Sequence, residues 1–433
     1  MKKYDFRIIA SMFILIGYIF FSPILSESKS SQFYEFATTV IINSSDLEIS
    51  QKEVEISKSL SQKSRTKYLP QLAGKLAGSA NSDEYEESSN SFGDFSASVS
   101  LSQELINLQK IYEIQSADQR VKAAQAGVIK VRQDVLHEFG LAWAAYWKAI
   151  QQVKVGKENV IILDKYRENS QIRYDAGELT ITDVRLAETR YQSARSQMSR
   201  FSKEMHRTHQ SLKEIIKGDV PTDVSLFKME MEEAISHRNG EILSNHPSVK
   251  PLIEERSALD LDIKQQKAGH LPSLSFVSSY EYQFDGEYNS SRYPHRDAKA
   301  GIEASIPIYS GGYVTQSTRE TIQKKQRQNH RIDKTQDEII RDINSSEFDL
   351  KQSFEEIKIV QLQFDYAKET LAGMNEEYEM GTRSSTDVFL VQADMINSKL
   401  AIVQAEEQHA RALINYLFSI GKLSLPVLET FSE

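Results

Sequence analysis

Apolar residues recur every seven positions along both halves of the chain. In the second half the row consists of Ile343, Leu350, Ile357, Phe364, Leu371 and Tyr378. In the first half it consists of Ile114, Val121, Val128, Val135 and Ala142. A strict period of seven predicts long helices packed as coiled coils with a left-handed supercoil. The stretch from Gly312 to Tyr378 has no proline, and as one helix it would be roughly 100 Å long.

A period of two precedes each of these rows and predicts strands with one apolar and one polar face. In the first half, Phe95, Ala97, Val99 and Leu101 alternate with serines. In the second half, one apolar face carries Leu274, Phe276, Tyr280, Tyr282 and Phe284, and another carries Ala300, Ile302, Ala304, Ile306 and Ile308. With a weaker strand at Leu69–Ala80, each half forms a hairpin. Long polar loops are expected at Asn81–Asp94 and Asp285–Asp297.

Three short segments occur twice in the same order. "YDAGELTITDVR" (174–185) matches "YEMGTRSSTDVF" (378–389) at an offset of 204 residues. "YLPQL" (68–72) matches "HLPSL" (270–274) at 202, and "SQELIN" (102–107) matches "SIPIYS" (305–310) at 203. Such matches indicate an internal duplication. We therefore expect a first repeat at 29–217, a linker at 218–245 and a second repeat at 246–433.

The duplicated twelve-residue segment has the chemistry of a turn between helices. Gly177 and Gly381 can take the left-handed conformation that ends a helix. Thr180 with Asp183, and Ser384 with Asp387, fit capping boxes that begin the next helix. Helices are then expected to run back from Asp183 and Asp387. Helix capping alone is therefore enough to explain why the aspartates are repeated.

The N-terminus predicts a signal peptide at residues 1–28. Lys2, Lys3 and Arg7 precede the apolar run Ile8–Leu25, and small residues follow it. An uncleaved membrane anchor is the alternative, because the run approaches the length of a span. Exported proteins are often stabilised by disulfides. Because this chain has no cysteine, packing or assembly must stabilise it instead.

Composition excludes several classes of function. Without cysteine the chain has no thiolate nucleophile and no Cys-based zinc site, and a net charge of −9 argues against binding of nucleic acid. His206 and His209 are spaced as half of a metal site, but nothing nearby completes it, so a solvated helix face is expected. No convergent catalytic set is present. We therefore expect no enzyme activity, no metal and no cofactor.

The amphipathic hairpins indicate a membrane sheet. A lone hairpin is barely stable in water, and a sheet in hydrocarbon must close to satisfy its backbone. Four strands are too few to close, so several chains must pool their strands. Polar strand faces would then line a conduit. The alternative is an exported coiled-coil structural or appendage subunit.

The chain resembles the outer-membrane efflux proteins of the TolC family. The resemblance rests on the following segments: "RYDAGELTITDV" (173–184), "GHLPSLSF" (269–276), "ASIPIYSGG" (304–312) and "YEMGTRSSTDV" (378–388). It implies a mainly α fold with a membrane β-hairpin part, in which a trimeric α-barrel tunnel joins a twelve-stranded β-barrel. It also implies a passive exit duct of a tripartite efflux or type I secretion system, in the outer membrane and extending into the periplasm. The implied partners are two further copies, a periplasmic adaptor, an inner-membrane pump and outer-membrane lipid.

The resemblance also implies roles for residues of the repeated turn. Positions that match the polar links of the closed tunnel end are occupied by Thr182, Asp183, Tyr378 and Arg383. Asp387 matches an acidic ring at the constriction, and Leu390 stands where the family has a second one. Tyr166 and Asn375 also replace expected polar or acidic partners. The adaptor is expected to contact Gly177, Glu178, Gly381 and Thr382.

Overall fold

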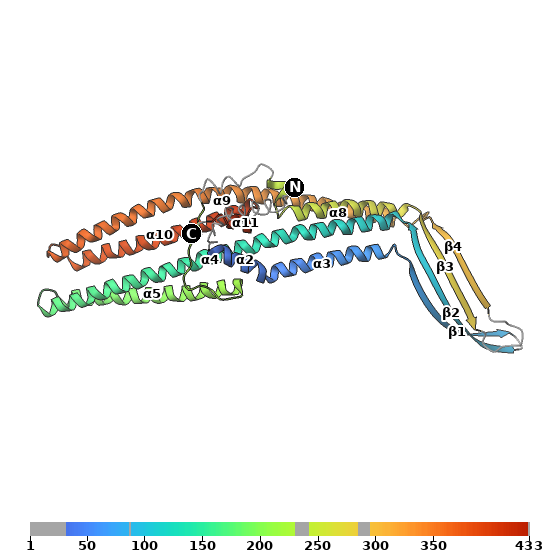
Figure 1. The fold of residues 1–433 in the computed structure, drawn as a ribbon, viewed down its shortest axis with the longest axis horizontal. Helices are drawn as coiled ribbons and strands as arrows, with labels where there is room; N and C mark the ends of the chain where they lie inside the picture. Colours follow the sequence, from blue (N-terminus) through green and yellow to red (C-terminus); the bar gives the residue numbers. More distant parts are fainter. Residues whose placement is uncertain (1–31, 86–87, 230–241, 285–294, 432–433) are drawn as a thin grey trace, which may run out of the picture.

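The computed structural model describes residues 32–85, 88–229, 242–284 and 295–431. It is an elongated protein with a sheet at one end and two helical turns at the other (Figure 1). The expected signal peptide lies outside the described residues. Among the described residues, no helix has both the length and the apolar character needed to cross a membrane.

Two very long helices connect the sheet to the turns, as the seven-residue period predicted. Helix α4 spans Leu108–Asp175 and helix α9 spans Tyr313–Glu379, with 68 and 67 residues respectively. Each is therefore about 100 Å long. Helices α5 (Ile181–Ile216) and α10 (Ser385–Ser419) run back from the turns beside them.

Each repeat also has a helix before its hairpin, which the sequence patterns did not predict. Helix α3 (Ser45–Thr66) precedes the first hairpin and packs on α4, and helix α8 (Lys250–Lys267) precedes the second hairpin. The hydroxyl of Ser44 caps α3 by accepting from the Leu47 amide at 3.2 Å. The buried side chains of α3 are few and seven residues apart, Leu47, Val54 and Ser61, so its apolar pattern is sparse.

The sheet has four antiparallel strands in the order β1-β2-β3-β4. Its strands are β1 (Gln71–Tyr85), β2 (Ser88–Ile106), β3 (Ser273–Phe284) and β4 (His295–Ser305). The prediction of a long loop at Asn81–Asp94 was wrong, because Asn81 pairs with Phe92 and Tyr85 with Ser88. The other predicted loop lies mostly outside the described residues. Strand β4 ends at Ser305, so Ile306 and Ile308 follow it.

The register of the hairpins reproduces the duplication. Gln71 pairs with Ser102 in the first hairpin, and Ser273 pairs with Ser305 in the second. These are displacements of 202 and 203 residues, the offsets of the sequence matches. Strand β2 then pairs with β3, so the two hairpins form one sheet.

The sheet has one apolar and one polar face, as the period of two predicted. Val99 lies opposite Tyr280, and Phe95 opposite Phe284, with 5.4 Å between the ring centroids of the two phenylalanines. In the alternate rows, Ser98 lies opposite Glu281 and Ser100 opposite Ser279. Large apolar side chains on the first face stay exposed in the single chain, among them Leu72, Leu76, Val99, Tyr280 and Ile302.

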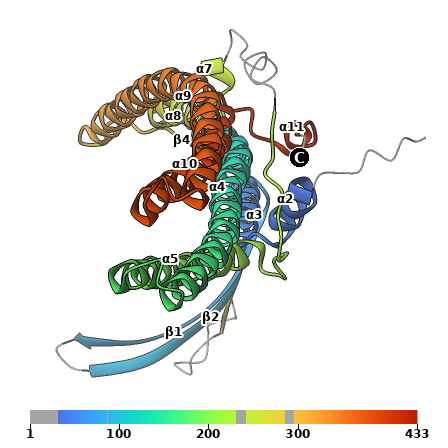
Figure 2. The same ribbon diagram turned by 90° about the vertical axis from the view of Figure 1, so that its left-hand side faces the viewer.

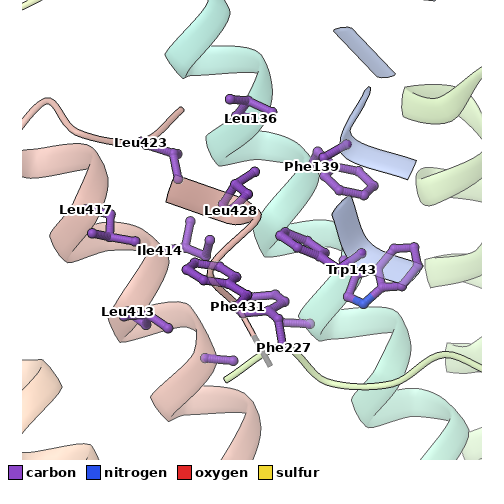
Figure 3. Close-up of a cluster of buried hydrophobic side chains, with 14 of the residues drawn as sticks. Leu136, Phe139, Trp143, Phe227, Leu413, Ile414, Leu417, Leu423, Leu428 and Phe431 are labelled. Carbon is purple, nitrogen blue, oxygen red and sulfur yellow. The ribbon is translucent and has the colours of Figure 1, made fainter. Parts of the chain in front are cut away.

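The main core lies near the middle of the long axis, where α2 (Gln32–Asn43) and α11 (Leu425–Leu428) are found (Figure 1), and it is built around the contact between α4 and α10 (Figure 3). Phe33 of α2 packs with Phe227 and Phe431, at centroid distances of 4.3 and 5.9 Å. Trp143 of α4 donates its indole N–H to the Ser225 carbonyl at 2.9 Å. The described part of the linker between repeats and helix α11 therefore both pack on this core.

Seen along the long axis, the four tip helices lie on a curved layer in the order α5, α4, α10, α9 (Figure 2). The contacts agree, because α4 packs on both α5 and α10, and α10 packs on α9. Among these four tip helices, the two repeats therefore meet at the α4–α10 contact, whereas farther from the tip they meet where α4 packs on α8 and where β2 pairs with β3.

Candidate functional site

The two turns at the tip share one backbone conformation. Gly177 and Gly381 have φ angles of +80° and +77°, in the left-handed region that favours glycine. The Glu178 amide donates to the Arg173 carbonyl at 2.9 Å, and the Thr382 amide donates to the Glu377 carbonyl at 3.0 Å. Both turns therefore close the preceding helix in the same way, as the sequence predicted.

Both predicted capping boxes are present. The carboxylate of Asp183 accepts from the Thr180 amide at 3.0 Å, and the hydroxyl of Thr180 accepts from the Asp183 amide at 3.3 Å. Ser384 and Asp387 repeat this arrangement, with amide donors at 3.2 and 3.3 Å. Hydrogen bonds from the cap residues, Thr180 and Ser384, hold the pKa of both aspartates below the ordinary value.

Asp183 makes one contact that Asp387 does not repeat. Its second carboxylate oxygen accepts a hydrogen bond from the hydroxyl of Ser385 at 3.1 Å. Ser385 is the first residue of α10, so this bond connects the turns of the two repeats. Asp183 is therefore both a helix cap and a link between repeats.

Two of the three departures from the family pattern, Tyr166 and Asn375, contact each other. The hydroxyl of Tyr166, on α4, donates to the side-chain carbonyl of Asn375, on α9, at 2.5 Å. Burial raises the pKa of Tyr166, so the phenol stays protonated and remains a donor. An uncharged hydrogen bond thus connects the repeats at this pair of positions.

Aromatic side chains add an apolar connection. Phe389 of α10 is only 3% exposed and lies in a cluster with Leu163, Ala187 and Ala194 of the first repeat. Its ring meets that of Tyr166 edge-on, with centroids 5.7 Å apart. Tyr378 is also buried, and the Arg173 guanidinium lies 5.0 Å from its ring centroid. Sequence reasoning missed Phe389, Ser385 and Arg173, because their roles depend on which helices meet.

The remaining predicted gate residues lie on the surface of the single chain. Arg383 pairs with Glu377 of its own repeat at 2.7 Å. Thr182 and Leu390 are exposed. The gate roles of Thr182, Asp183, Tyr378, Arg383, Asp387 and Leu390 therefore stay predictions, which concern contacts with neighbouring copies.

The predicted adaptor residues form the outermost surface of the turns. Gly177, Glu178, Gly381 and Thr382 are all exposed. A Cβ atom on Gly177 or Gly381 would meet nothing within 4 Å, so each glycine leaves open space as well as supplying the left-handed turn. The backbone at both turns is thus accessible to a partner.

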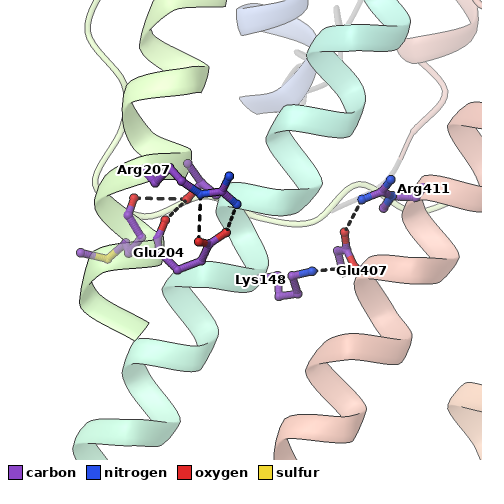
Figure 4. A network of polar contacts seen from close by, with 7 residues as sticks. Lys148, Glu204, Arg207, Glu407 and Arg411 are labelled. Carbon is purple, nitrogen blue, oxygen red and sulfur yellow. Dashed lines mark hydrogen bonds and ion pairs between the residues drawn. The ribbon is translucent and has the colours of Figure 1, made fainter. Parts of the chain in front are cut away.

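One charged side chain, that of Glu407, is buried at the α4–α10 contact, farther from the tip (Figure 4). The carboxylate of Glu407 is 1% exposed and pairs with Lys148 at 3.2 Å and with Arg411 at 3.3 Å. His209 of the histidine pair lies edge-on to Tyr146, at 5.6 Å between centroids. Within the described ranges, no cluster of three metal-ligating side chains occurs.

A sheet with an exposed apolar face, continuous with long helices that end in paired turns, defines a channel-forming membrane protein of the exit-duct type. The family comparison agrees with this class. The model of the family described as outer membrane efflux protein matches residues 38–217 and 240–422. The chain belongs to that family, and it is an outer-membrane channel. The two matched segments also correspond to the two repeats, and the alternative of an appendage subunit is set aside.

Named relatives and solved structures are consistent with this assignment. The outer membrane efflux protein BepC of Brucella suis is 22% identical over 72% of this chain and 68% of the relative. The outer membrane protein TolC of Vibrio cholerae is 19% identical over 83% of this chain and 84% of the relative. The fold is similar to that of the Campylobacter jejuni CmeC outer membrane channel, with a TM-score of 0.79 and 14% identity over 91% of this chain and 86% of that one.

Proposed function

We propose that three copies of this chain form one duct, a twelve-stranded barrel in the outer membrane continuous with a helical tunnel in the periplasm. The observation that carries this proposal is the four-stranded sheet, whose outer strands β1 and β4 each pair on one side only. Such edges leave backbone groups unpaired, which is untenable in hydrocarbon. Pairing of β4 with β1 of the next copy would remove every edge.

The duplication predicts the register of that pairing. Leu101 of β2 lies opposite Ser278 of β3 where the repeats meet. The hairpin offsets of 203 and 202 residues carry these positions to Ala304 of β4 and Leu76 of β1. We therefore expect Ala304 to lie opposite Leu76 of the neighbouring copy.

Cysteine crosslinking tests both the trimer and its register, because the chain has no cysteine of its own. Leu76→Cys with Ala304→Cys should give covalent trimers on oxidation in detergent. Leu76→Cys with Ala298→Cys, six residues off register on the same strand face, is the matched control. A particle mass of one chain, or equal crosslinking of both pairs, would contradict the proposal.

We also propose that the turns bind a periplasmic adaptor, through which an inner-membrane pump delivers cargo to the duct. The open space at Gly177 and Gly381 supports close approach of a partner to the backbone. Conduction itself is passive. The chain carries no proposed catalytic group and no proposed cofactor.

A pair of substitutions tests the adaptor site. Gly381→Trp should abolish adaptor crosslinking, since the indole would fill the open space. Gly381→Ala is the control, because it imposes the same left-handed strain at φ +77° with a much smaller side chain. Loss of crosslinking in both variants would mean that turn geometry, not access, explains the effect. Retained crosslinking in Gly381→Trp would exclude this site.

The cargo follows from the pump that engages the duct. The names of the relatives indicate different kinds of cargo. PrtF of Dickeya chrysanthemi is named as a proteases secretion protein, and it is 21% identical over 64% of this chain and 63% of the relative. BepC is named as an efflux protein. For this chain we propose service in either tripartite efflux or type I secretion. Co-purification of the trimer with its adaptor and pump would decide between them.

A further inference from the structure

We propose that the inner wall of the duct has a binding site for cationic amphiphiles, small molecules that combine an apolar body with a positive charge. The site is a hollow on α4, between α3 and α8. It would give the duct a preference of its own among the molecules that pass through it. This inference rests on the proposed function, because the hollow faces the lumen only if copies of the chain close into a ring.

The α4 hollow has the size and the lining of a small-molecule site. Its volume is about 800 Å³, within the usual range for such sites. A Cβ atom on Gly127 would meet nothing within 4 Å, so this glycine adds to the open space. The apolar or small residues in its lining include Ile49, Ala124, Gly127, Val131, Pro251 and Leu252. An apolar body can therefore be buried there.

The α4 hollow opens on the concave side of the curved layer of helices. Figure 2 shows α2 on the convex side of α4, where Phe33 stacks on Phe139 with 5.1 Å between ring centroids. Leu136 belongs to the same core. Gly127 lies about two and a half helical turns from Leu136, so it faces the opposite side of α4. Closure into a ring turns that side toward the lumen.

Carboxylates surround the opening of the α4 hollow. Asp46 and Glu53 of α3 and Glu138 of α4 are exposed, and among the described residues none of the three has an ion-pair partner. The basic side chain of the lining, Lys130, pairs with Asp134 at 2.7 Å, so these two charges offset each other. An apolar lining inside uncompensated negative charge suits a cation with an apolar body. An anion would be repelled there.

The second repeat does not reproduce the α4 hollow. The ion pair of Lys130 recurs as Lys334 with Glu338, which supports an offset of 204 residues along this part of the helices. At that offset Gly127 corresponds to Arg331, which is exposed. A guanidinium at this place would occupy the open space and repel a cationic ligand. We therefore expect three sites in the trimer and not six.

Two ions of the same shape and opposite charge, tetraphenylphosphonium and tetraphenylborate, test the proposal. Their binding to the trimer in lipid nanodiscs can be measured by equilibrium dialysis. Lipid takes up both ions, but equally for every variant, so the comparison between variants removes this uptake. We expect Gly127→Trp to remove the binding of three phosphonium ions and no borate. Gly127→Ala is the matched control, because alanine suits a helix and leaves the hollow open.

A second replacement protects this test against a failure of the tryptophan variant to assemble. Gly127→Arg introduces the residue that the second repeat has at this position, and it should also abolish phosphonium binding. Unchanged phosphonium binding in the filled variants, or equal loss of phosphonium and borate binding, would overturn the proposal. A particle mass of one chain for the unmodified protein would refute the ring itself, whereas a trimer that binds no phosphonium would refute only the site.

The contribution of the carboxylates has its own test. Glu53→Gln with Glu138→Gln should weaken phosphonium binding by about tenfold at low salt, the range for two exposed ion pairs. The effect should shrink as salt is added, because mobile ions screen exposed charges. Glu48→Gln with Glu55→Gln is the control, since it removes two exposed carboxylates of α3 that do not line the α4 hollow. Equal weakening by both pairs would show attraction by net charge alone and contradict a site.

Discussion

The first and second turns of the tip have the same backbone and different side chains. Both have a left-handed glycine, a capped helix and an aspartate at the third position of that helix. Yet the second turn inserts Phe389 and Ser385 toward the first repeat, and the first turn carries Arg185 and Ile181 at those positions. Turn geometry is therefore a property of the repeat, and the contacts made by the turn are a property of each copy.

The largest expected effect comes from removing the side chain that differs most. Phe389→Ala should weaken the local stability of the tip by up to about 3–5 kcal/mol, the range for a buried phenylalanine. Arg185→Ala should change it by less than about 0.5 kcal/mol, because Arg185 is exposed. Hydrogen exchange of the α5 and α10 amides measures both. Similar losses in the two variants would mean that the turns are equivalent after all.

The next effect concerns closure. Arg383→Ser with Tyr378→Phe should raise channel conductance severalfold, since a guanidinium can donate several directional hydrogen bonds to a neighbouring copy. Position 383 corresponds to Leu179 in the first turn, so Leu179→Ser is the matched control. Planar bilayer recording is the measurement. An unchanged conductance in the double variant would show that packing alone keeps the tip closed.

A smaller effect is expected on ion selectivity. Three copies of Asp387 would place a ring of carboxylates at the constriction, which favours cations. Asp387→Asn should reduce cation selectivity, while Asp183→Asn should leave it nearly intact and loosen the link to Ser385. Leu390→Asp should strengthen block by divalent cations by adding a second ring. Unaltered selectivity in Asp387→Asn, with lower thermal stability, would make this carboxylate only a helix cap.

The smallest effect is that of pH. The pKa of Asp183 and of Asp387 is lower in the folded protein than the unperturbed value of about 3.9. Their contribution to stability is thus present above that value and is lost as the pH falls through the folded pKa. Hydrogen-exchange protection of the turns, corrected for intrinsic rates, should fall below about pH 4. The fall should be steeper at the first turn, where Asp183 also accepts from Ser385. Asp183→Asn should flatten that difference.

Local chemistry explains which parts of this structure could be predicted from sequence. The capping boxes, the left-handed glycines and the alternating strand faces each depend on a few neighbouring residues, and all were confirmed. The strand segment at Asn81–Asp94 was missed because polar residues give no period-two signal there. Helix α3 was missed because few of its residues are buried.

Contacts between repeats follow from assembly of the fold and not from local pattern. Tyr166 and Asn375 are 209 residues apart in sequence, and each alone looked like the loss of a family partner. Because α10 packs on both α4 and α9, these two residues come within reach of each other and form one hydrogen bond. The sequence does contain a signal for such sites, namely the positions at which the two aligned repeats differ. Ser385 and Ile181 are one such pair.

Joining two repeats in one chain has a consequence for symmetry. A ring of six identical short chains must carry the same side chain at every position, so a mutation that strengthens one contact strengthens all six. Here alternate positions are encoded separately, and Phe389 and Arg185 can diverge while the backbone keeps its repeat. Because of the duplication, the contacts between repeats within one chain and the contacts between neighbouring chains can change independently in evolution.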